Sequence, residues 1–386
     1  MNRRQIGVIA GLGTAQTLAW ASSYYLPAVL ANAIASDLGI PTLWVFAAFS
    51  VGLLISGSCA PFSGRLIDLH GGHWVLSASN LLFAVGLTSL AVASGPVSLI
   101  TSWVIMGAAM SCGLYEAAFS TLTRIYGKEA RRSITGIALI AGFASTVGWP
   151  LTAFLEISFG WRTACFIWAA VHVLICLPLN VLLPRGQYSS RTPAETGQVS
   201  TQRRSNWIMG VLAFVFAGTL FGSASMAAHL PRVLQDAGAT LPAAIAAAAL
   251  VGPAQVAARV VEFWLMRRLH PLTSAQVAAL AHPLGAGILL ATGAAAAPLF
   301  TVLHGAGNGV MTIARGTIPL HLFGWEGYGL RQGFLMLPGR LVQAGAPLIF
   351  DVLFSLMGAA AVGATAACGL ASFVMLTVLR RITERR

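Results

Sequence analysis

Charge is scarce in this sequence. Only 9% of the 386 residues are charged, whereas a soluble globular domain carries about 25% because water must wet its surface. Hydrophobic residues make up 57% of the chain, and the mean hydropathy is +0.78. Such a chain cannot cover a water-facing surface, so lipid must be its main solvent. This excludes a soluble enzyme, a disordered chain and a nucleic-acid-binding domain.

Lysine is almost absent. Lys128 is the single lysine, and the other 22 of the 23 basic residues are arginine. The net charge of +12 would indicate nucleic acid binding in a soluble domain. Here the arginines lie in short connections between apolar runs, which is typical of membrane topology.

The motifs of metal, disulfide and nucleotide chemistry are also missing. The five cysteines all lie inside apolar runs, without a CxxC pair or a histidine at zinc-ligand spacing. We interpret them as inert packing residues. The chain has no GxxxxGK[ST] loop, so ATP-driven pumping is not expected. We expect no enzyme activity and no cofactor.

Long apolar runs dominate what is present. Runs of about 20 residues recur from end to end, and each can cross a bilayer core of about 30 Å. They do not alternate apolar with polar residues, which argues against a β-barrel. Start and stop signals predict an all-α membrane protein with twelve helices. These cover residues 6–34, 43–67, 74–93, 97–126, 133–157, 161–183, 206–234, 242–266, 273–293, 299–323, 328–355 and 359–380. We interpret the first as a retained helix and not as a signal peptide.

The arginines predict the orientation. Arg and Lys in short loops mark the cytoplasmic side of a membrane protein, and here they fill alternate connections and both ends of the sequence. The remaining connections hold Arg162 and, near an edge, Arg232. We therefore expect both termini to lie in the cytoplasm and the protein to be a multi-pass protein of a bacterial inner membrane.

The chain repeats itself. Residues 185–205 form the one stretch of linker composition, which predicts two six-helix bundles, 1–184 and 206–386. Tyr25–Leu30 matches His229–Leu234, and the pair Arg65 and Asp68 matches Arg259 and Glu262. A third match lies at one offset in helices 5 and 11: Gly136, Gly142, Gly148 and Pro150 correspond to Gly333, Gly339, Gly345 and Pro347. Parallel six-helix repeats with a substrate site near the midplane are typical of one large transporter class.

One loop carries a family pattern. Residues 64–76, GRLIDLHGGHWVL, resemble the loop between helices 2 and 3 of the major facilitator superfamily, with Gly64, Leu66, Asp68 and Gly71 in place. The usual basic residues are replaced by Leu69, Gly72 and His73. The resemblance implies two pseudo-twofold-related six-helix bundles that transport by alternating access.

A narrower resemblance covers helices 2–6. Residues 126–142 and the run Gly160-Trp161-Arg162 are similar to the monocarboxylate and organic-anion porters of that superfamily. The acidic-Gly-Gly-Trp run of the animal monocarboxylate carriers is missing from the first helix. The resemblance also implies that helices 1, 4, 7 and 10 line the cavity, which would place Glu116, Arg315, His229 and Tyr24 or Tyr25 inward.

Charged and polar side chains deep in the apolar runs are the candidate site residues, because charge in hydrocarbon is costly and usually functional. Glu116 lies far into helix 4, and Arg315 lies at nearly the equivalent position of helix 10. His304, Asn308, Thr312 and Arg315 share one helical face, as do Arg340, Gln343, Pro347 and Asp351. We assign substrate binding to Arg315, Arg340, Tyr25, Asn308 and Gln343. We assign proton coupling to Glu116 and His229.

Each assignment has a structural alternative. Glu116 and Arg315 would either form a salt bridge or divide proton and anion binding between them. In the second case, a substrate carboxylate on the guanidinium fork would favour protonation of the glutamate. Arg340 would bind either substrate or Asp351. His229 and His304 are more often packed than proton-carrying, and Trp20 and Trp149 are more often packing than stacking residues.

A further group lies at the ends of helices 2 and 8. We assign Asp68, Arg65, Glu262, Arg331 and Arg131 to gating or structural contacts. The expected pairs are Asp68 with Arg331, and Glu262 with Arg131 or Arg132.

These observations predict a monomeric secondary transporter of a small organic anion, of the monocarboxylate kind, coupled to protons. Its partners would be the substrate, protons and the lipid bilayer, and not nucleic acid. Two rivals stay open. One is proton-driven efflux of drugs or toxic metabolites, and the other is a membrane sensor that transports nothing.

Overall fold

The structure is a computed structural model that describes residues 3–185, 199–264 and 270–384. Within these ranges the secondary structure is helical, with no strand. Seven continuous helical stretches are long and apolar enough to cross a membrane. Three of them run for 86, 53 and 56 residues. Because one span needs about 20 residues, each of these three holds two or three spans.

The chain divides into two compact units. The first comprises Met1–Pro193 with Leu322–Phe334, and the second comprises Ala194–His321 with Leu335–Arg386. Residues 186–198 of the predicted linker lie outside the described residues, and α10 begins at Val199, inside the predicted linker. The division of the chain at 185–205 therefore stays a prediction.

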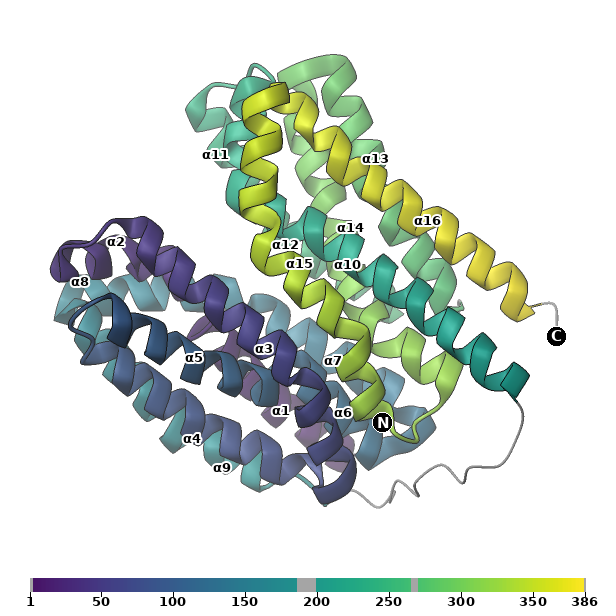
Figure 1. Ribbon diagram of the computed structural model, residues 1–386, viewed down its shortest axis with the longest axis horizontal. Coiled ribbons are helices and arrows are strands. Elements are labelled where there is room, and N and C mark those ends of the chain that lie inside the picture. The colour runs from purple at the N-terminus through teal and green to yellow at the C-terminus, as the bar shows by residue number, and fades with distance from the viewer. Residues whose placement is uncertain (1–2, 186–198, 265–269, 385–386) are drawn as a thin grey trace. The chain divides into compact units, whose positions relative to one another are not determined.

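The described residues of the first unit up to 185 form nine α-helices, and α3, α4 and α5 run side by side (Figure 1). The helices are α1 (Arg3–Ala21), α2 (Pro27–Leu38), α3 (Thr42–His70), α4 (Gly72–Ala91), α5 (Pro96–Gly113), α6 (Tyr115–Tyr126), α7 (Ala130–Ile140), α8 (Ala144–Val171) and α9 (Leu177–Val181). A short 3-10 turn, η1 (Gly127–Glu129), joins α6 to α7 and exposes Lys128.

Among its described residues the second unit contains seven α-helices, two of which also contribute residues to the first unit. They are α10 (Val199–Asp236), α11 (Leu241–Ala248), α12 (Val251–Trp264), α13 (Pro271–Thr292), α14 (Ala297–Phe323), α15 (Tyr328–Met357) and α16 (Val362–Glu384). The helices α10, α13 and α16 pack side by side (Figure 1). Leu234, Phe300 and Phe350 belong to a buried apolar cluster of this unit.

The predicted helices occur in the predicted order, but several are interrupted. The span predicted at 6–34 breaks between Ala21 and Pro27, and the span at 97–126 breaks at Leu114, which is extended at φ −90°, ψ −165°. The span at 242–266 is divided between α11 and α12. In α8, Gly160 takes a φ of +80°, and this conformation separates helix 5 from helix 6. The all-α prediction is confirmed.

A left-handed glycine precedes the last span of each unit. Gly160 has a φ of +80° and Gly358 a φ of +58°. Beside each of these two turns lies an aspartate from the end of the first span of the same unit. In the first unit Arg162, two residues after Gly160, binds Asp37 at the end of α2. In the second unit the Ala359 N–H, one residue after Gly358, donates to Asp236 at 2.5 Å. The repeat seen in the sequence thus extends to this turn.

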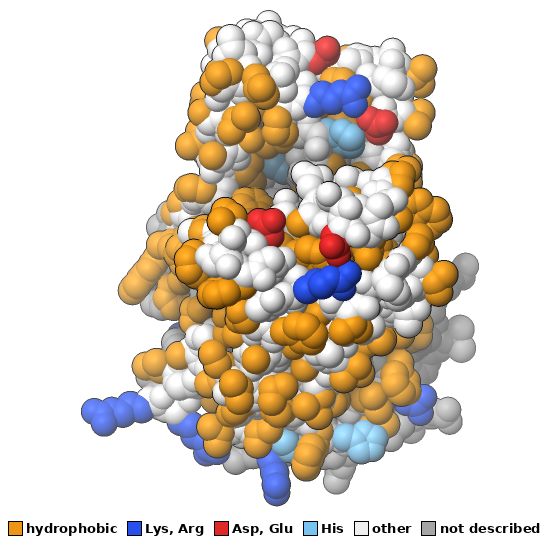
Figure 2. Space-filling model, turned by 90° about the vertical axis from the view of Figure 1, so that its left-hand side faces the viewer, with side chains coloured by type: hydrophobic (Ala, Val, Ile, Leu, Met, Phe, Trp, Pro, Cys, Tyr) orange, Lys and Arg blue, Asp and Glu red, His pale blue; other side chains and the backbone are white. Residues whose placement is uncertain are grey.

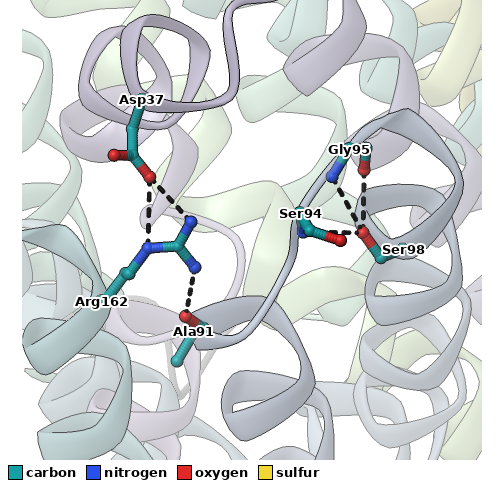
Figure 3. Close-up of polar contacts among 6 residues, drawn as sticks. All are labelled: Asp37, Ala91, Ser94, Gly95, Ser98 and Arg162. Carbon is teal, nitrogen blue, oxygen red and sulfur yellow. Dashed lines mark hydrogen bonds and ion pairs between the residues drawn. The ribbon is translucent and has the colours of Figure 1, made fainter.

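The Arg162 guanidinium joins three helix ends (Figure 3). Its Nε and Nη2 donate to Asp37 Oδ2 at 3.1 and 2.7 Å, and its Nη1 donates to the Ala91 carbonyl at the end of α4 at 2.7 Å. The two charged side chains stay 40% and 46% exposed. This exposure limits the strength of the pair, because solvent and salt screen exposed charges.

We expect Asp37→Asn to lower the free energy of unfolding by at most ~1 kcal/mol. Arg162→Gln should cost more, because it also removes the donor to the Ala91 carbonyl. Thermal unfolding in detergent, at low and high salt, measures both changes and their double variant. The matched control is the same set of substitutions in the pair Arg232–Asp351, which is joined by a single contact of 2.8 Å. Equal losses at both salt concentrations would contradict a contribution from the ion pair.

Apolar side chains cover much of the face shown in Figure 2. Large side chains such as Val97, Ile157, Leu182 and Leu356 are more than two-thirds exposed. Patches of this extent on a protein surface mark contact with an apolar partner. Together with the apolar helices, they define a protein that spans a membrane several times.

Candidate functional site

Two helix breaks meet in the first unit. Helix α1 ends at Ala21 and helix α5 ends at Gly113, and each end frees backbone carbonyls. Gln16 Nε2 donates to the Gly113 carbonyl at 2.6 Å, so the side chain of one broken span satisfies the other. Non-helical backbone at membrane depth is tolerated where protein buries it or where it lines a cavity. The breaks are therefore the first place to look for a site.

The breaks are lined by aromatic rings. Trp20 lies 5.3 Å from Tyr24 and 5.0 Å from Tyr115 between ring centroids. Tyr25 lies 5.7 Å from Trp149. We call Trp20, Tyr24, Tyr25, Tyr115 and Trp149 the aromatic cluster. The Trp20 indole N–H is buried and has no hydrogen-bond partner among the described residues, so it can donate to a bound molecule.

Glu116 lies next to the aromatic cluster. It is half-buried in the first turn of α6, directly after the Leu114 break and beside Tyr115. Its backbone carbonyl accepts a hydrogen bond from Ser120 Oγ at 2.7 Å. Since Arg315 belongs to the second unit, the predicted pairing of Glu116 with Arg315 stays a prediction.

Two buried guanidinium groups mark the second unit. Arg315 on α14 is 8% exposed and donates from Nη2 to Thr219 Oγ1 at 3.2 Å. Arg340 on α15 is 6% exposed and donates from Nη1 to Gln343 Oε1 at 2.9 Å. Both of these acceptors are neutral.

Arg315 and the helix that carries Arg340 both contact α10. A Cβ on Gly339 would lie 2.7 Å from Leu220 Cδ1 and 3.6 Å from the Ala217 backbone. The missing side chain therefore lets α15 pack closely on α10, one residue before Arg340. Thr219, the acceptor for Arg315, lies in the same turn of α10.

A small cavity adjoins Thr219. Its volume is about 40 Å³, and its lining includes Thr219, Ser223, His282, His304, Asn308 and Thr365. The predicted substrate residue Asn308 thus borders a cavity together with the acceptor for Arg315. Several small residues, among them Gly218, Gly307 and Gly369, complete the wall.

The partner of Asp351 differs from the alternative weighed for it, and His229 contacts the same helix. Asp351, the alternative partner for Arg340, instead binds Arg232 of α10, with Nη1 2.8 Å from Oδ1. His229 donates from Nε2 to the Pro347 carbonyl at 3.0 Å and packs on Phe350. The sequence pattern placed Asp351 on the correct helix, α15, but it could not identify α10 as the helix that Asp351 faces.

Near Asp68, where gating contacts are predicted, the end of α3 packs closely on the start of α15. Asp68 accepts the N–H groups of Gly329 and Leu330 at 3.0 and 2.9 Å, at the start of α15. Arg124 donates to the carbonyls of Ile67 and Asp68. The positive end of a helix favours a carboxylate, so Asp68 caps α15.

The other gating residues have different surroundings. Arg331 donates to the carbonyls of Phe323, Gly324 and Glu326 in the preceding loop, and its predicted gating contact with Asp68 stays a prediction. Arg65 is exposed on α3. Glu262 is buried on α12 in the second unit, and Arg131 lies on α7 in the first. Their pairing stays a prediction.

Several members of these sites escaped the sequence reasoning. Gln16, Tyr115, Thr219 and His282 are single polar or aromatic residues within apolar runs, and spacing alone gave them no partner. The sequence alone favoured a packing role for Trp20. A signal was present at Leu26-Pro27, because proline at a first turn marks a helix start and so places a break just before it.

A protein that crosses the membrane repeatedly, with broken spans in its first unit and buried arginines in its second, fits the class of multi-pass membrane transporters. The sequence matches the family model described as Major Facilitator Superfamily over residues 12–347, and the chain belongs to this family.

The similar proteins include one curated relative and several solved structures. A protein of Thermoproteus tenax, described as "Uncharacterized 38 kDa protein in 23S RNA operon", is 30% identical over 160 residues. That match spans 41% of this chain and 42% of the relative, so less than half of the relative's length is covered.

The solved structures cover nearly the whole chain. The human organic anion transporter MFSD10 (TETRAN) is 16% identical with a TM-score of 0.73, over 97% of this chain and 100% of its own. The transporter FucP in the outward conformation is 16% identical with a TM-score of 0.74, over 97% and 99%. The proton:xylose symporter XylE is 12% identical with a TM-score of 0.73, over 96% and 94%. These proteins are transporters and not enzymes, and at such identities the likeness shows the fold alone.

Proposed function

We propose that this protein is a secondary transporter that moves a small organic anion of the monocarboxylate kind by alternating access, coupled to protons. It acts as a monomer in a bacterial inner membrane, with both termini and the 185–205 linker in the cytoplasm. The arginine distribution supports this orientation.

The observation that carries the proposal is the pair of buried guanidinium groups in the second unit. Arg315 and Arg340 are at most 8% exposed, and each donates to a neutral side chain. A guanidinium presents a planar fork of donors that fits a carboxylate through two parallel hydrogen bonds. Asn308 and Thr219, which border the cavity beside Arg315, supply further polar contacts. Gln343 and, in the first unit, Tyr25 complete the proposed substrate residues.

Proton coupling is assigned to Glu116 and His229. We expect Glu116→Gln to keep exchange of substrate across the membrane and to lose accumulation driven by a pH gradient. Glutamine keeps the size and hydrogen-bonding capacity of glutamate but cannot take up a proton. Counterflow and gradient-driven uptake in proteoliposomes measure the two activities separately.

The structural alternative for Glu116 predicts a different outcome. If the glutamate only neutralises a buried arginine, its replacement strands that charge and destabilises the fold by roughly 3–5 kcal/mol. Thermal unfolding of the same variant separates the two roles. Intact gradient-driven uptake in Glu116→Gln would remove the coupling role.

The aromatic cluster favours a second candidate, the efflux of cationic amphiphiles. One acid, Glu116, directly follows Tyr115 of this cluster, and aromatic faces attract cations. This candidate requires no buried guanidinium, so we place it second.

A ligand panel tests the proposal. Thermal shift on purified protein would compare pyruvate, lactate, benzoate and succinate with pyruvamide, fucose and tetraphenylphosphonium. A ligand that binds only the folded state raises its stability by mass action. Stabilisation by a carboxylate but not by pyruvamide, followed by uptake in proteoliposomes, supports the proposal. A response to tetraphenylphosphonium alone supports efflux, and folded protein with no response or flux supports the sensor.

A further inference from the structure

Two histidines face each other in the second unit. His282 on α13 and His304 on α14 approach with their Nδ1 atoms 3.0 Å apart. His282 Nε2 lies 2.8 Å from Thr365 Oγ1 on α16. Both rings border the cavity of about 40 Å³ described above. None of these contacts is required for the binding of an anion by Arg315.

The hydrogen bonds assign the protons of the neutral pair. The single hydroxyl hydrogen of Thr365 is donated to the Val362 carbonyl at 2.8 Å, so Thr365 accepts from the His282 Nε2–H. In a neutral ring the His282 Nδ1 is then an acceptor, and the His304 Nδ1–H is its donor. The His304 Nε2 therefore carries a lone pair, and it has no hydrogen-bond partner among the described residues.

A proton arriving from the cavity can bind this lone pair. A volume of about 40 Å³ holds on the order of two or three water molecules, each of which needs roughly 10–15 Å³. Protonation of His304 Nε2 would turn the bond between the rings into a charge-assisted one, which is stronger than a neutral hydrogen bond. The charge is thereby shared between two imidazoles.

The same geometry limits the pair to one proton. After the first proton, the remaining lone pair is His282 Nδ1, which already accepts the hydrogen bond. A second proton would break that bond and place two cations with their nitrogens 3.0 Å apart, and like charges this close disfavour double ionisation.

Two other groups on the surrounding helices carry or can carry charge near the pair. They are Arg315 on α14 and Cys368 on α16, which lies beside the cavity-lining Gly218 of α10. The described parts of α10 and α13 bring no further charged group to the cavity lining. Arg315 does not line the cavity but donates to Thr219, which does. An anion bound at Arg315 would add negative charge on the Thr219 side of the cavity, and nearby negative charge favours a protonated imidazole.

We propose that His282 and His304 form a shared site for a single proton, loaded from the adjoining cavity and linked to anion binding at Arg315. Thr219 makes the link, since it lines the cavity and accepts from Arg315. Anion and proton then stabilise each other reciprocally, which is the sign that symport requires. The link to transport rests on the proposed function, whereas the proton site itself does not.

Counting protons tests the site without any substrate. The full chain in detergent is titrated potentiometrically between about pH 3 and 8, because a free imidazole titrates at about pH 6.5 and burial moves the titration of an imidazole to lower pH. We expect His304→Asn and the double variant each to bind one proton fewer than the wild type, because both lose the Nε2 lone pair that takes up the proton. His282→Asn keeps that lone pair and should bind as many protons as the wild type. Asparagine places an amide near the position of Nδ1 and so keeps the contact between α13 and α14.

His172 provides the matched control. It is fully buried in the first unit, and both of its nitrogens are hydrogen-bonded, to Ser22 at 2.8 Å and to Asn80 at 3.0 Å. His172→Asn should therefore bind as many protons as the wild type. A loss of two protons in the His282/His304 double variant, or an unchanged count, would overturn the proposal.

Folding of the variants is checked by thermal unfolding. If His304→Asn is unfolded, the double variant decides by the same count. In the unmodified protein, spectra of ¹⁵N-labelled histidine should show two rings that change together in one titration step. Rings that change in separate steps, or not at all, argue against the shared site.

Transport tests the link. With pyruvate, or the carboxylate of the panel with the largest thermal shift, His304→Asn should lose accumulation against the gradient, whereas His172→Asn should keep it. Full accumulation by His304→Asn would refute the link. If the wild type takes up no carboxylate, the proposed function fails, and the proton count still decides the site.

Discussion

Arg315→Lys should weaken the binding of the carboxylate substrate by one to two decades, although the positive charge is kept. The ammonium group of lysine is a point charge and cannot offer the planar fork. Loss of one charge-assisted contact of about 1.5–3 kcal/mol corresponds to that decrease in affinity. Lysine also cannot reproduce the hydrogen bond of 3.2 Å that Arg315 Nη2 donates to Thr219 Oγ1. Thermal shift and uptake as functions of substrate concentration measure the effect.

The control for this variant is Arg232→Lys. Arg232 is an arginine of the same unit, but its side chain is 54% exposed and binds Asp351. Its replacement should change the affinity for carboxylate little. Equal affinities of the wild type and Arg315→Lys would show that Arg315 does not hold the substrate through two hydrogen bonds.

Gly64→Ala should strongly destabilise the first unit. A Cβ at this position would lie 2.0 Å from the Gly329 carbonyl oxygen and 2.9 Å from the Leu330 nitrogen. Both obstacles are backbone atoms, so α3 and the start of α15 would have to separate. Separation would also stretch the two hydrogen bonds by which Asp68 caps α15. Overpacking of this kind costs about 1–3 kcal/mol, and the lost cap adds about 1 kcal/mol.

Gly287→Ala is the control for the substitution itself. Gly287 is exposed on α13, and a Cβ there would meet nothing within 4 Å. Alanine is favoured over glycine inside a helix, so this variant should melt at or above the temperature of the wild type. Thermal unfolding in detergent compares the two. A Gly64→Ala protein that melts like the wild type would mean that the helices do not cross as closely as described.

The fold was largely predictable because lipid imposes a simple rule. A spanning segment must satisfy its own backbone, so apolar runs of the right length predict helices, and glycine and proline predict where they end. The order of the spans and the left-handed turn at Gly160 follow from this pattern. The break at Leu114 does not, because Leu114 is an ordinary helix former and the Gly113 carbonyl accepts from the Gln16 side chain, which comes from a distant part of the chain.

The sites were harder to predict because spacing fixes a helical face but not its neighbour. Arg315 and Asn308 share a face, and Asn308 does border a cavity. Asp351 shares a face with Arg340 and yet binds Arg232, because α10 lies on that side. His282 could not be distinguished from a packed histidine until α13 and α14 were placed together.

The single lysine offers an experimental advantage of its own. Lys128 lies exposed in the η1 turn, between the helix that carries Glu116 and the helix that carries Arg131. Besides the terminal α-amine, an amine-selective fluorophore would react with this one lysine side chain, whereas the arginines would not react. The native protein therefore carries a built-in attachment point at the junction of α6 and α7. Changes in the surroundings of this junction during turnover could be followed by its emission, without engineered cysteines.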